Sequence, residues 1–520
     1  MAKDKGLVII HVDGLGYRYL HQAMAEGYMP FVQQLIARED YVPLRWRCGV
    51  PSTTPYVQAG LMFGDDSEIP SFRWWDKEAN RLIVFGGLST FRYVSDQYFR
   101  GSEPLLGNGA AIATCYTAEA VETYRLSYRQ RERRSSPLPT RHPTRRYTAS
   151  HVLAGWLSNP LHLLDMLRTG AWQFYRANRK YISAKLRGMR TADTYVLTNV
   201  LEEIFLHQLT RYATIQAMHE AYAIIYSAFY SYDSMAHAFG PESEYSARSV
   251  RHIDRSIGRI AAARSTPQRD YEILILSDHG QTETIPFADV NGRTLGPFVA
   301  EYLPHYDVEE YHGKRYAAAE QPAAGHVVLA YSGGLAHLYL KDEPGRLDRA
   351  RIETKTPGLI DRVTHTPGVG FVMLRDDHSD LLLTPGGELR IDEHAGFSDG
   401  MSEFLKKFDE PEIVAGQLHK LNSFKRSGDL VIFGALSGER QTNFENQIGG
   451  HGSLGGEQLF PFLLAKREWG FDTSQVSDAC DLYPQLKHLR DRLIRAPAPA
   501  LVASDLPIPL SGGMAGRATL

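Results

Sequence analysis

The stretch that decides the fold is Leu276-Ser277-Asp278-His279-Gly280, which directly follows the apolar run at 271–275. That run has the length and composition of a strand buried in a parallel sheet. A carboxylate and an imidazole at its end would lie beyond the strands' carboxyl ends, where open α/β sheets bind ligands. Anionic oxygen and neutral imidazole nitrogen both suit zinc. Because such a pair alone is more often a polar turn, a metal site needs support from other stretches.

Three other stretches carry carboxylates and imidazoles in patterns that suit a metal. Asp13 ends the β-branched run at 7–12, which predicts a second strand with a carboxylate at its carboxyl end. Asp233 and His237 are four residues apart, so in a helical turn they share one face and can bind one ion. His451 has a glycine on each side, which would let its ring approach an ion closely.

A hydroxyl-rich turn, Pro51-Ser52-Thr53-Thr54, supplies the candidate nucleophile. Hydroxyls in a Pro-bounded turn ahead of a helix are often caps, and that interpretation has equal weight. The alternative is a threonine nucleophile stabilised by a metal, while N–H groups at the helix start hold a phosphate. Cys48 does not form the sulfatase pattern Cys-x-Pro-x-Arg, since Pro51 is three residues on and no Arg follows.

The composition is that of a soluble globular protein, with 43% hydrophobic and 22% charged residues and a net charge of −3 over 520 residues. Three widely spaced cysteines (Cys48, Cys115 and Cys480) form no disulfide framework, which fits a reducing compartment. No apolar run approaches the roughly 18–20 residues of a membrane-spanning helix, and the first residues lack a signal-peptide core. We therefore predict a cytoplasmic location.

The charge is distributed unevenly along the chain. Between Tyr124 and Arg190 there are 15 lysines and arginines against only Glu132 and Asp165. Apolar and aromatic residues alternate with this charge in patterns that predict amphipathic helices at 153–167 and 171–186, with another helix at 192–217. Such a segment can contact an anionic membrane from one side, or it can be a solvated cap over the protein. No recognisable nucleic-acid-binding module accompanies the charge, so no specific nucleic-acid partner is predicted.

These observations divide the chain. We expect a discontinuous α/β core at 1–120 and 218–490, a basic helical insertion at 121–217 and a poorly ordered tail at 491–520, which is rich in Pro, Ala and Gly. Within the core, apolar runs predict further strands at 327–331, 336–340, 369–374 and 429–434, and a hairpin over 381–390.

The stretches around Asp13, Thr54, Asp233, Asp278 and His451, in this order, resemble the alkaline phosphatase superfamily, specifically its type I phosphodiesterase/nucleotide pyrophosphatase branch. The resemblance covers roughly 5–120 and 218–470 and leaves out the insertion and the tail. It implies a three-layer α/β sandwich with a mainly parallel central sheet.

The resemblance also implies two divalent ions, zinc with manganese or magnesium as alternatives. Two sets of ligands would hold them, namely Asp13, Thr54, Asp278 and His279 for one ion and Asp233, His237 and His451 for the other. Thr54 would be the nucleophile and form a phosphothreonine. Thr54 fits better than Thr53 because it follows Pro51 by three residues and precedes Gly64 by ten. Asn108 and Arg73 are the candidate substrate contacts, and His11 is a candidate for supporting the site.

We therefore expect a two-metal hydrolase that cleaves phosphodiester or pyrophosphate bonds of a phosphorylated small molecule. No arginine follows Thr54, which favours diesters over the more highly charged monoesters. Phe72, Trp74 and Trp75 could stack a base, although such clusters are more often core. The alternatives are a phosphomonoesterase or phosphomutase on the same metal site, and a catalytically idle member that binds membranes through the basic insertion.

Overall fold

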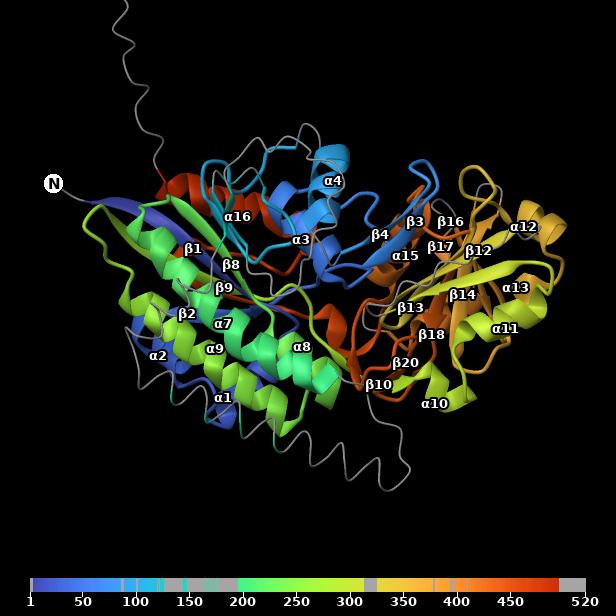
Figure 1. The fold of residues 1–520 in the computed structure, drawn as a ribbon, viewed down its shortest axis with the longest axis horizontal. Helices are drawn as coiled ribbons and strands as arrows, with labels where there is room; N and C mark the ends of the chain where they lie inside the picture. Colours follow the sequence, from blue (N-terminus) through green and yellow to red (C-terminus); the bar gives the residue numbers. More distant parts are fainter. Residues whose placement is uncertain are drawn as a thin grey trace, which may run out of the picture.

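The computed structural model describes residues 3–85, 88–99, 102–118, 120, 122–125, 144–146, 164, 168, 171, 175, 195–312, 325–376, 379–392, 396–397, 399–408 and 410–494. Two eight-stranded sheets dominate the described part of the chain, and they lie side by side along the long axis of the molecule (Figure 1). The tail predicted at 491–520 is wrong at its start, because residues 491–493 are the end of helix α16 (Ala479–Leu493). From 495 onward this tail lies outside the described residues, as does most of the predicted basic insertion.

The first sheet contains the strands predicted around Asp13 and Asp278. Its order is β2 (Tyr41–Arg45), β22 (Phe462–Lys466), β9 (Arg269–Leu276), β1 (Asp4–Val12), β8 (Ile224–Phe229), β5 (Ala110–Ile112), β6 (Glu122–Arg125) and β7 (Thr144–Arg146). The strands from β9 to β7 are parallel to one another, while β22 is antiparallel to both β9 and β2. The predicted α/β class with a mainly parallel central sheet is confirmed.

Helices cover both faces of this sheet (Figure 1). One layer contains α1 (Tyr17–Ala25), α2 (Pro30–Glu39), α7 (Tyr195–His219), α8 (Ser231–Phe239) and α9 (Glu244–Ala262). The opposite layer contains α3 (Thr54–Phe63), α4 (Leu88–Tyr98) and α16 (Ala479–Leu493). The strands between the layers are almost continuously apolar and buried, because both faces of a parallel sheet are covered.

Within the first layer, a single carboxylate joins two helices. The Asp254 side chain on α9 accepts hydrogen bonds from the backbone N–H groups of Phe31 and Val32, at 3.0 and 2.9 Å, in the first turn of α2. These N–H groups have no acceptor within their own helix, so Asp254 both caps α2 and positions it against α9.

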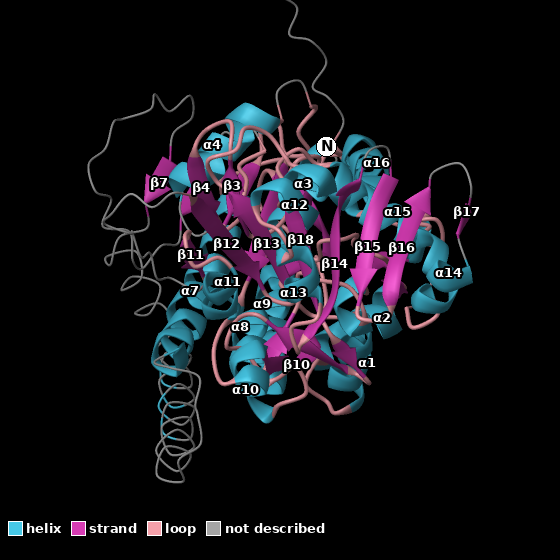
Figure 2. Ribbon diagram, turned by 90° about the vertical axis from the view of Figure 1, so that its right-hand side faces the viewer, coloured by secondary structure: helices cyan, strands magenta, loops and turns pink. Residues whose placement is uncertain are grey.

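The second sheet is mostly antiparallel. Its order is β11 (Asp307–Tyr311), β12 (His326–Ser332), β13 (Leu335–Leu340), β18 (Leu430–Gly434), β14 (Val369–Asp376), β15 (Ser379–Thr384), β16 (Gly387–Asp392) and β17 (Gly396–Phe397). It contains all the strands and the hairpin predicted between 327 and 434. The helices that accompany it are α11 (Leu295–Tyr302), α12 (Arg349–Lys355), α13 (Leu359–Thr364), α14 (Asp399–Leu405) and α15 (Pro411–Ser423). Figure 2 shows this sheet from its own side of the molecule.

Smaller elements join the two sheets. A four-stranded sheet has the order β19 (Leu436–Ser437), β20 (Arg440–Asn443), β10 (Thr282–Pro286) and β21 (Gly449–Gly450), and β3 (Arg73–Asp76) pairs with β4 (Arg81–Val84). Short helices α10 (Phe287–Asn291), η1 (Gly456–Leu459) and η2 (Arg467–Trp469) complete the described elements. Strand β10 leaves the Asp278 stretch directly, and β21 leads directly into His451, so this small sheet brings distant parts of the chain together.

The segment predicted as a helical insertion differs in part from that prediction. The helix predicted at 192–217 is present as α7, but β6 and β7 lie within 121–217 and extend the central sheet in parallel register. The pairing of β6 with β5 and of β7 with β6 supplies backbone hydrogen-bond partners that periodicity along a short segment does not reveal. None of the described helices is long and apolar enough to cross a membrane.

Candidate active site

The candidate site lies at the carboxyl ends of three neighbouring parallel strands. Asp13 follows β1, Asp278 follows β9, and Asp233 lies in the first turn of α8, directly after β8. Because β1 lies between β8 and β9 in register, the three carboxylates meet at one edge of the sheet. This edge is where open α/β sheets bind their ligands.

The first cluster consists of Asp13, Thr54, Asp278 and His279, and all four are buried. The Thr54 hydroxyl donates to Asp13 Oδ1 at 3.3 Å and lies 3.2 Å from His279 Nε2. His279 Nε2 is in turn 3.5 Å from Asp13 Oδ1 and 3.4 Å from Asp278 Oδ2. The structure therefore brings together the four residues that the resemblance assigned to one ion.

The second cluster consists of Asp233, His237 and His451. His237 Nε2 lies 3.3 Å from Asp233 Oδ2 and 3.1 Å from His451 Nε2, and His451 Nε2 lies 3.6 Å from Asp233 Oδ1. The His451 ring stacks on that of His279, with 3.7 Å between ring centroids, so the two clusters are in direct contact. The Asp233 and His451 side chains are 15% and 12% exposed, while the first cluster is almost closed, so solvent reaches the site from the second cluster.

Backbone carbonyl groups set the tautomers of the three clustered histidines. In each ring Nδ1 lies 2.8 or 2.9 Å from a carbonyl oxygen, which can only accept a hydrogen bond. The pairs are His279 with Gly280, His237 with Gly449, and His451 with Ser52. Each neutral ring therefore carries its proton on Nδ1 and directs the lone pair of Nε2 into the cluster, as a metal-binding histidine requires.

A close approach at a tight turn places His451. Strands β12 and β13 are joined by the two-residue turn Gly333-Gly334, with Gly333 at φ +65°. The backbone of His451 passes against this turn, and a Cβ at Gly333 would collide with the His451 carbonyl oxygen. The second sheet thus contributes to the site by positioning one ligand.

The donor set fits divalent cations. The Nε2 atoms of His237 and His451 lie 3.1 Å apart. Burial lowers the pKa of His237, but the charge of Asp233 outweighs burial and raises that pKa, so this position stabilises positive charge, as a proton or as a metal ion. Asp278 Oδ2 is fully buried and has no hydrogen-bond donor, although a buried carboxylate oxygen is normally paired. Imidazole nitrogens with carboxylate and hydroxyl oxygens are ligands that zinc accepts.

The electrostatics of the protein alone favour the metal-binding form of Asp278 and His451 but not that of Asp13. Burial raises the pKa of Asp13 well above its usual range, and the charges of Asp278 and Asp233 raise it further. Burial alone would also raise the pKa of Asp278, but His279 and then His11 outweigh it and lower that pKa. Burial, followed by the neighbouring His279, lowers the pKa of His451 to about 3. At neutral pH Asp278 is therefore ionised and His451 neutral, which are the forms that bind a metal.

His11 supports Asp278 and has the opposite tautomer to the clustered histidines. Gln58 Oε1 accepts the backbone N–H of Cys115 at 2.9 Å, so the amide nitrogen of Gln58 must face His11 Nδ1, 3.2 Å away. The Tyr226 hydroxyl is also 3.3 Å from Nδ1. Because Nδ1 accepts, the proton is on Nε2, which lies 3.0 Å from Asp278 Oδ1.

The hydrogen-bond donors around Asp278 therefore all lie at one of its two carboxylate oxygens. Oδ1 accepts the backbone N–H groups of Gly14 and His279 at 3.2 and 3.0 Å, in addition to its contact with His11. Oδ2, which faces the cluster, has none. In the second cluster a side-chain donor also orients a carboxylate, since the Gln281 amide donates to Asp233 Oδ1 at 2.6 Å.

Sequence reasoning missed Gln58 and Gln281. Gln58 follows Thr54 by four residues on α3, so helical spacing would have placed both on one face. Gln281 directly follows the Asp278 stretch, but its partner Asp233 is 48 positions away, and no local pattern indicates that contact.

The hydroxyl groups of Thr54 and Thr53 lie in different surroundings. Thr54 is the first residue of α3, and its hydroxyl lies inside the first cluster. Thr53 Oγ1 is buried without a hydrogen-bond partner, and the Thr53 methyl faces Gly452. The preceding Ser52 is held by its own contacts, since its hydroxyl donates to Gln458 Oε1 at 3.1 Å.

The two candidate substrate contacts lie elsewhere. Asn108 is exposed in the turn ahead of β5, at the amino end of a strand whose carboxyl end faces the site, so the structure does not bring it to either cluster. Arg73 is buried, donates to the Tyr331 carbonyl at 2.6 Å and pairs with Glu445 at 3.1 Å. Glu445 Oε2 also accepts the N–H of Gly333, so Arg73 supports the turn behind His451. Trp74 and Trp75 are buried in the core.

The family model described as type I phosphodiesterase / nucleotide pyrophosphatase matches residues 7–350, and the chain belongs to this family. It is therefore a phosphoric ester hydrolase by class. Among solved structures, the chain is similar to phosphonoacetate hydrolase from Sinorhizobium meliloti 1021 in complex with phosphonoformate, at 14% identity, with 94% of this chain and 96% of that chain covered and a TM-score of 0.49.

The chain is also similar to murine ectonucleotide pyrophosphatase / phosphodiesterase 5, at 13% identity, with 94% of this chain and 95% of that chain covered and a TM-score of 0.48. The search of curated proteins gave no match.

Proposed function

We propose that this chain is a two-metal hydrolase of phosphodiester or pyrophosphate bonds that reacts through a phosphothreonine at Thr54. The observation that carries the proposal is the place of the Thr54 hydroxyl, at the start of α3 and within 3.3 Å of Asp13 Oδ1 and 3.2 Å of His279 Nε2. Two ions would be held by the two clusters described above, zinc with manganese or magnesium as alternatives. When bound, they supply positive charge that activates the attacking oxygen and offsets charge on the leaving oxygen.

The chain's own residues orient the nucleophile. Asp13 Oδ1 accepts the hydrogen bond of the Thr54 hydroxyl, which fixes the direction of Oγ1. In the first step Oγ1 gives up its proton to solvent and bonds to phosphorus as the bond from phosphorus to the leaving oxygen breaks, and the leaving oxygen takes up a proton. In the second step a water molecule gives up a proton as its oxygen bonds to phosphorus and the bond to Oγ1 breaks, and Oγ1 takes up a proton, which returns the free hydroxyl. The N–H groups in the first turn of α3 favour the negative charge of the phosphoryl oxygens.

The charge of the site favours a diester over a monoester. Neither cluster contains a lysine or arginine, and the residues after Thr54 are Pro55, Tyr56 and Val57. Tyr56 is buried and donates to Asp478 at 2.5 Å, so it faces away from the substrate. A monoester dianion carries one more negative charge than a diester, and these clusters offer no cationic side chain to meet it. The complete ligand set also argues against a catalytically idle protein.

Paired threonine variants test the nucleophile. Thr54→Ala should lower hydrolysis of bis-p-nitrophenyl phosphate by about a thousand-fold or more, as the loss of a nucleophile does. Elemental analysis should still find two equivalents of metal, because side chains other than Thr54 supply most of the ligands. Thr53→Ala is the matched control, and it should keep most of the activity. An inactive Thr53→Ala beside an active Thr54→Ala would show that the wrong hydroxyl was assigned.

A comparison of substrates and metal stoichiometry tests the rest. The wild-type protein should hydrolyse the bis-p-nitrophenyl diester faster than p-nitrophenyl phosphate, and the reverse order would favour a phosphomonoesterase. Asp233→Ala and His237→Ala should each lose one equivalent of metal and keep the other. Two tightly bound equivalents in either variant would contradict the grouping of ligands.

A further inference from the structure

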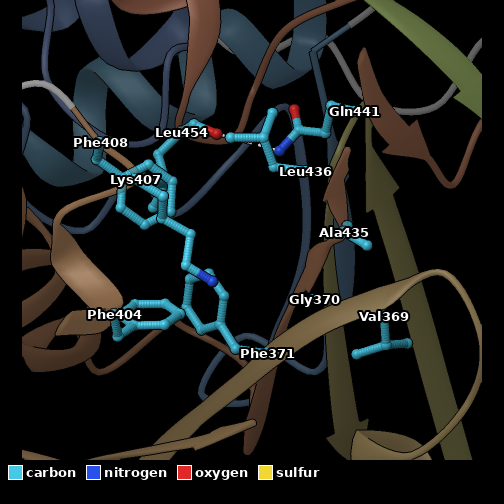
Figure 3. A pocket seen from close by; sticks show the side chains of 11 residues that line it. Val369, Gly370, Phe371, Phe404, Lys407, Phe408, Ala435, Leu436, Gln441 and Leu454 are labelled. Atoms are coloured by element: carbon cyan, nitrogen blue, oxygen red, sulfur yellow. Dashed lines mark hydrogen bonds between the residues drawn. The ribbon is translucent and has the colours of Figure 1, made fainter. Parts of the chain in front are cut away.

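A pocket of about 200 Å³ lies away from both clusters, where α14 and the residues after it approach the second sheet (Figure 3). Its walls come from β14, α14 and the residues after it, β18, β19, β20 and the loop ahead of η1. The side chains that give it its character are Phe371, Phe404, Phe408, Leu436, Leu454 and Lys407. The three phenylalanines pack edge to face in sequence, with 5.3 Å between the centroids of Phe371 and Phe404 and 5.6 Å between those of Phe404 and Phe408.

Lys407 is the cationic residue that lines this pocket. Its side chain extends among the aromatic rings, and Nζ lies 4.4 Å from the centroid of the Phe404 ring (Figure 3). Lys407 is an exposed residue, and the partial burial of its side chain lowers its pKa. Among the described residues no carboxylate pairs with this ammonium, whereas the preceding Lys406 pairs with Glu403 at 2.6 Å on the surface.

The other polar side chain of the pocket, Gln441, forms hydrogen bonds within the protein. The Gln441 amide nitrogen donates to Ser453 Oγ at 3.0 Å and to the Leu454 carbonyl at 3.1 Å. Its amide oxygen accepts from Gln458 Nε2 at 2.9 Å. Because these contacts use both N–H groups, Gln441 has no free donor for a ligand carboxylate. The side chains of the pocket therefore offer apolar surface and a single cationic donor.

We propose that this pocket binds a small carboxylate with a compact aromatic or aliphatic body. The body would cover the phenylalanine and leucine side chains, which in an empty pocket lose contacts on one side, and the carboxylate would pair with Lys407 Nζ. Neutral or cationic molecules of the same shape would gain only the apolar contribution. The pocket shares no residue with the two metal clusters, so this ligand is separate from the substrate of the proposed hydrolase.

Calorimetric titration of the metal-loaded full chain tests the proposal, with 4-phenylbutyrate as the probe and 4-phenylbutan-1-ol as its neutral counterpart. The wild-type protein should bind the acid about five-fold more tightly than the alcohol, the upper range for a partly exposed ion pair. Lys407→Met keeps the length and apolar character of the side chain and should bring the acid to the affinity of the alcohol. Lys406→Met, the neighbouring lysine with its own partner, should change neither affinity.

A second variant tests the apolar part. Phe404→Leu should weaken the acid and the alcohol by the same factor, since both use the ring, and thermal unfolding of each variant checks that it is folded. Equal affinity of wild type and Lys407→Met for the acid, or no binding of either probe to wild type, would overturn the proposal. Binding is measured without substrate, so these outcomes do not depend on whether the chain hydrolyses diesters. Carboxylate binding directly to the metal clusters would persist in Lys407→Met and is thereby distinguished.

Discussion

Replacing His11 should weaken the metal held by the first cluster without unfolding the protein. His11 Nε2 carries a proton, as its Nδ1 contacts with Gln58 and Tyr226 require, and lies 3.0 Å from Asp278 Oδ1. This proton helps to keep Oδ1 occupied and Oδ2 turned into the cluster. His11→Phe removes the proton and keeps a ring of similar size.

The size of the effect follows from the contacts of Asp278. A hydrogen bond to a charged group contributes about 1.5–3 kcal/mol, and groups that orient a metal ligand affect affinity by about 10–100-fold. Two backbone N–H groups remain on Oδ1 in the variant, at 3.2 and 3.0 Å, and the His11 contact is imperfectly aligned. We therefore expect the low end, a loss of about ten-fold in zinc affinity, which corresponds to about 1.4 kcal/mol.

Competition with a chromophoric chelator measures this loss for each of the two ions. One ion should dissociate about ten-fold more readily from His11→Phe, and the other should keep its wild-type affinity, because Asp233 is oriented by Gln281 and not by His11. Tyr226→Phe is the control, since it removes only the longer of the two contacts to Nδ1. Unchanged affinity for both ions in His11→Phe, or an equal loss in Tyr226→Phe, would refute the reasoning.

Two further predictions concern regions outside the site. The buried Asp66 and Asp478 both pair with Lys420, whose Nζ lies 2.6 Å from Asp66 and 3.2 Å from Asp478. Burial, and then the charge of Asp478, raise the pKa of Asp66. The contribution of Asp66 to stability is therefore present at low pH and is lost as the pH rises through the raised pKa. At neutral pH Asp66→Asn should therefore leave the unfolding temperature unchanged or higher, whereas Lys420→Met should destabilise the fold by about 3–5 kcal/mol, because it leaves the buried carboxylate of Asp478 without its cation. A lower unfolding temperature for Asp66→Asn than for Lys420→Met would contradict this. The basic segment 124–190 has two interpretations, contact with an anionic membrane or a soluble cap. Membrane contact requires co-sedimentation with anionic vesicles at low salt that disappears at high salt, and absence of pelleting at low salt would leave the segment as a soluble cap.

The predictable part of the site consists of strand ends and short motifs. Asp13 and Asp278 were predicted at the carboxyl ends of strands because apolar runs end directly before them, and Asp233 with His237 because of helical spacing. The structure brings these residues together with Thr54, His279 and His451. Asn108 shows the limit of such reasoning, since its position along the chain does not indicate which end of the sheet it occupies.

The sequence by itself determined the chemical types of the ligands, their order along the chain and the alternation of strands and helices that places them. These properties are local, because hydrophobic periodicity and residue chemistry act over a few positions. The tautomers and the orientations of these ligands depend on the tertiary structure. The proton on His451 Nδ1 depends on the carbonyl of Ser52, 399 positions away, and that on His11 Nε2 depends on Gln58, which the N–H of Cys115 orients in turn. A tautomer is set by which donor or acceptor lies at about 3 Å, and that distance exists only once the sheets and their connecting strands have packed together.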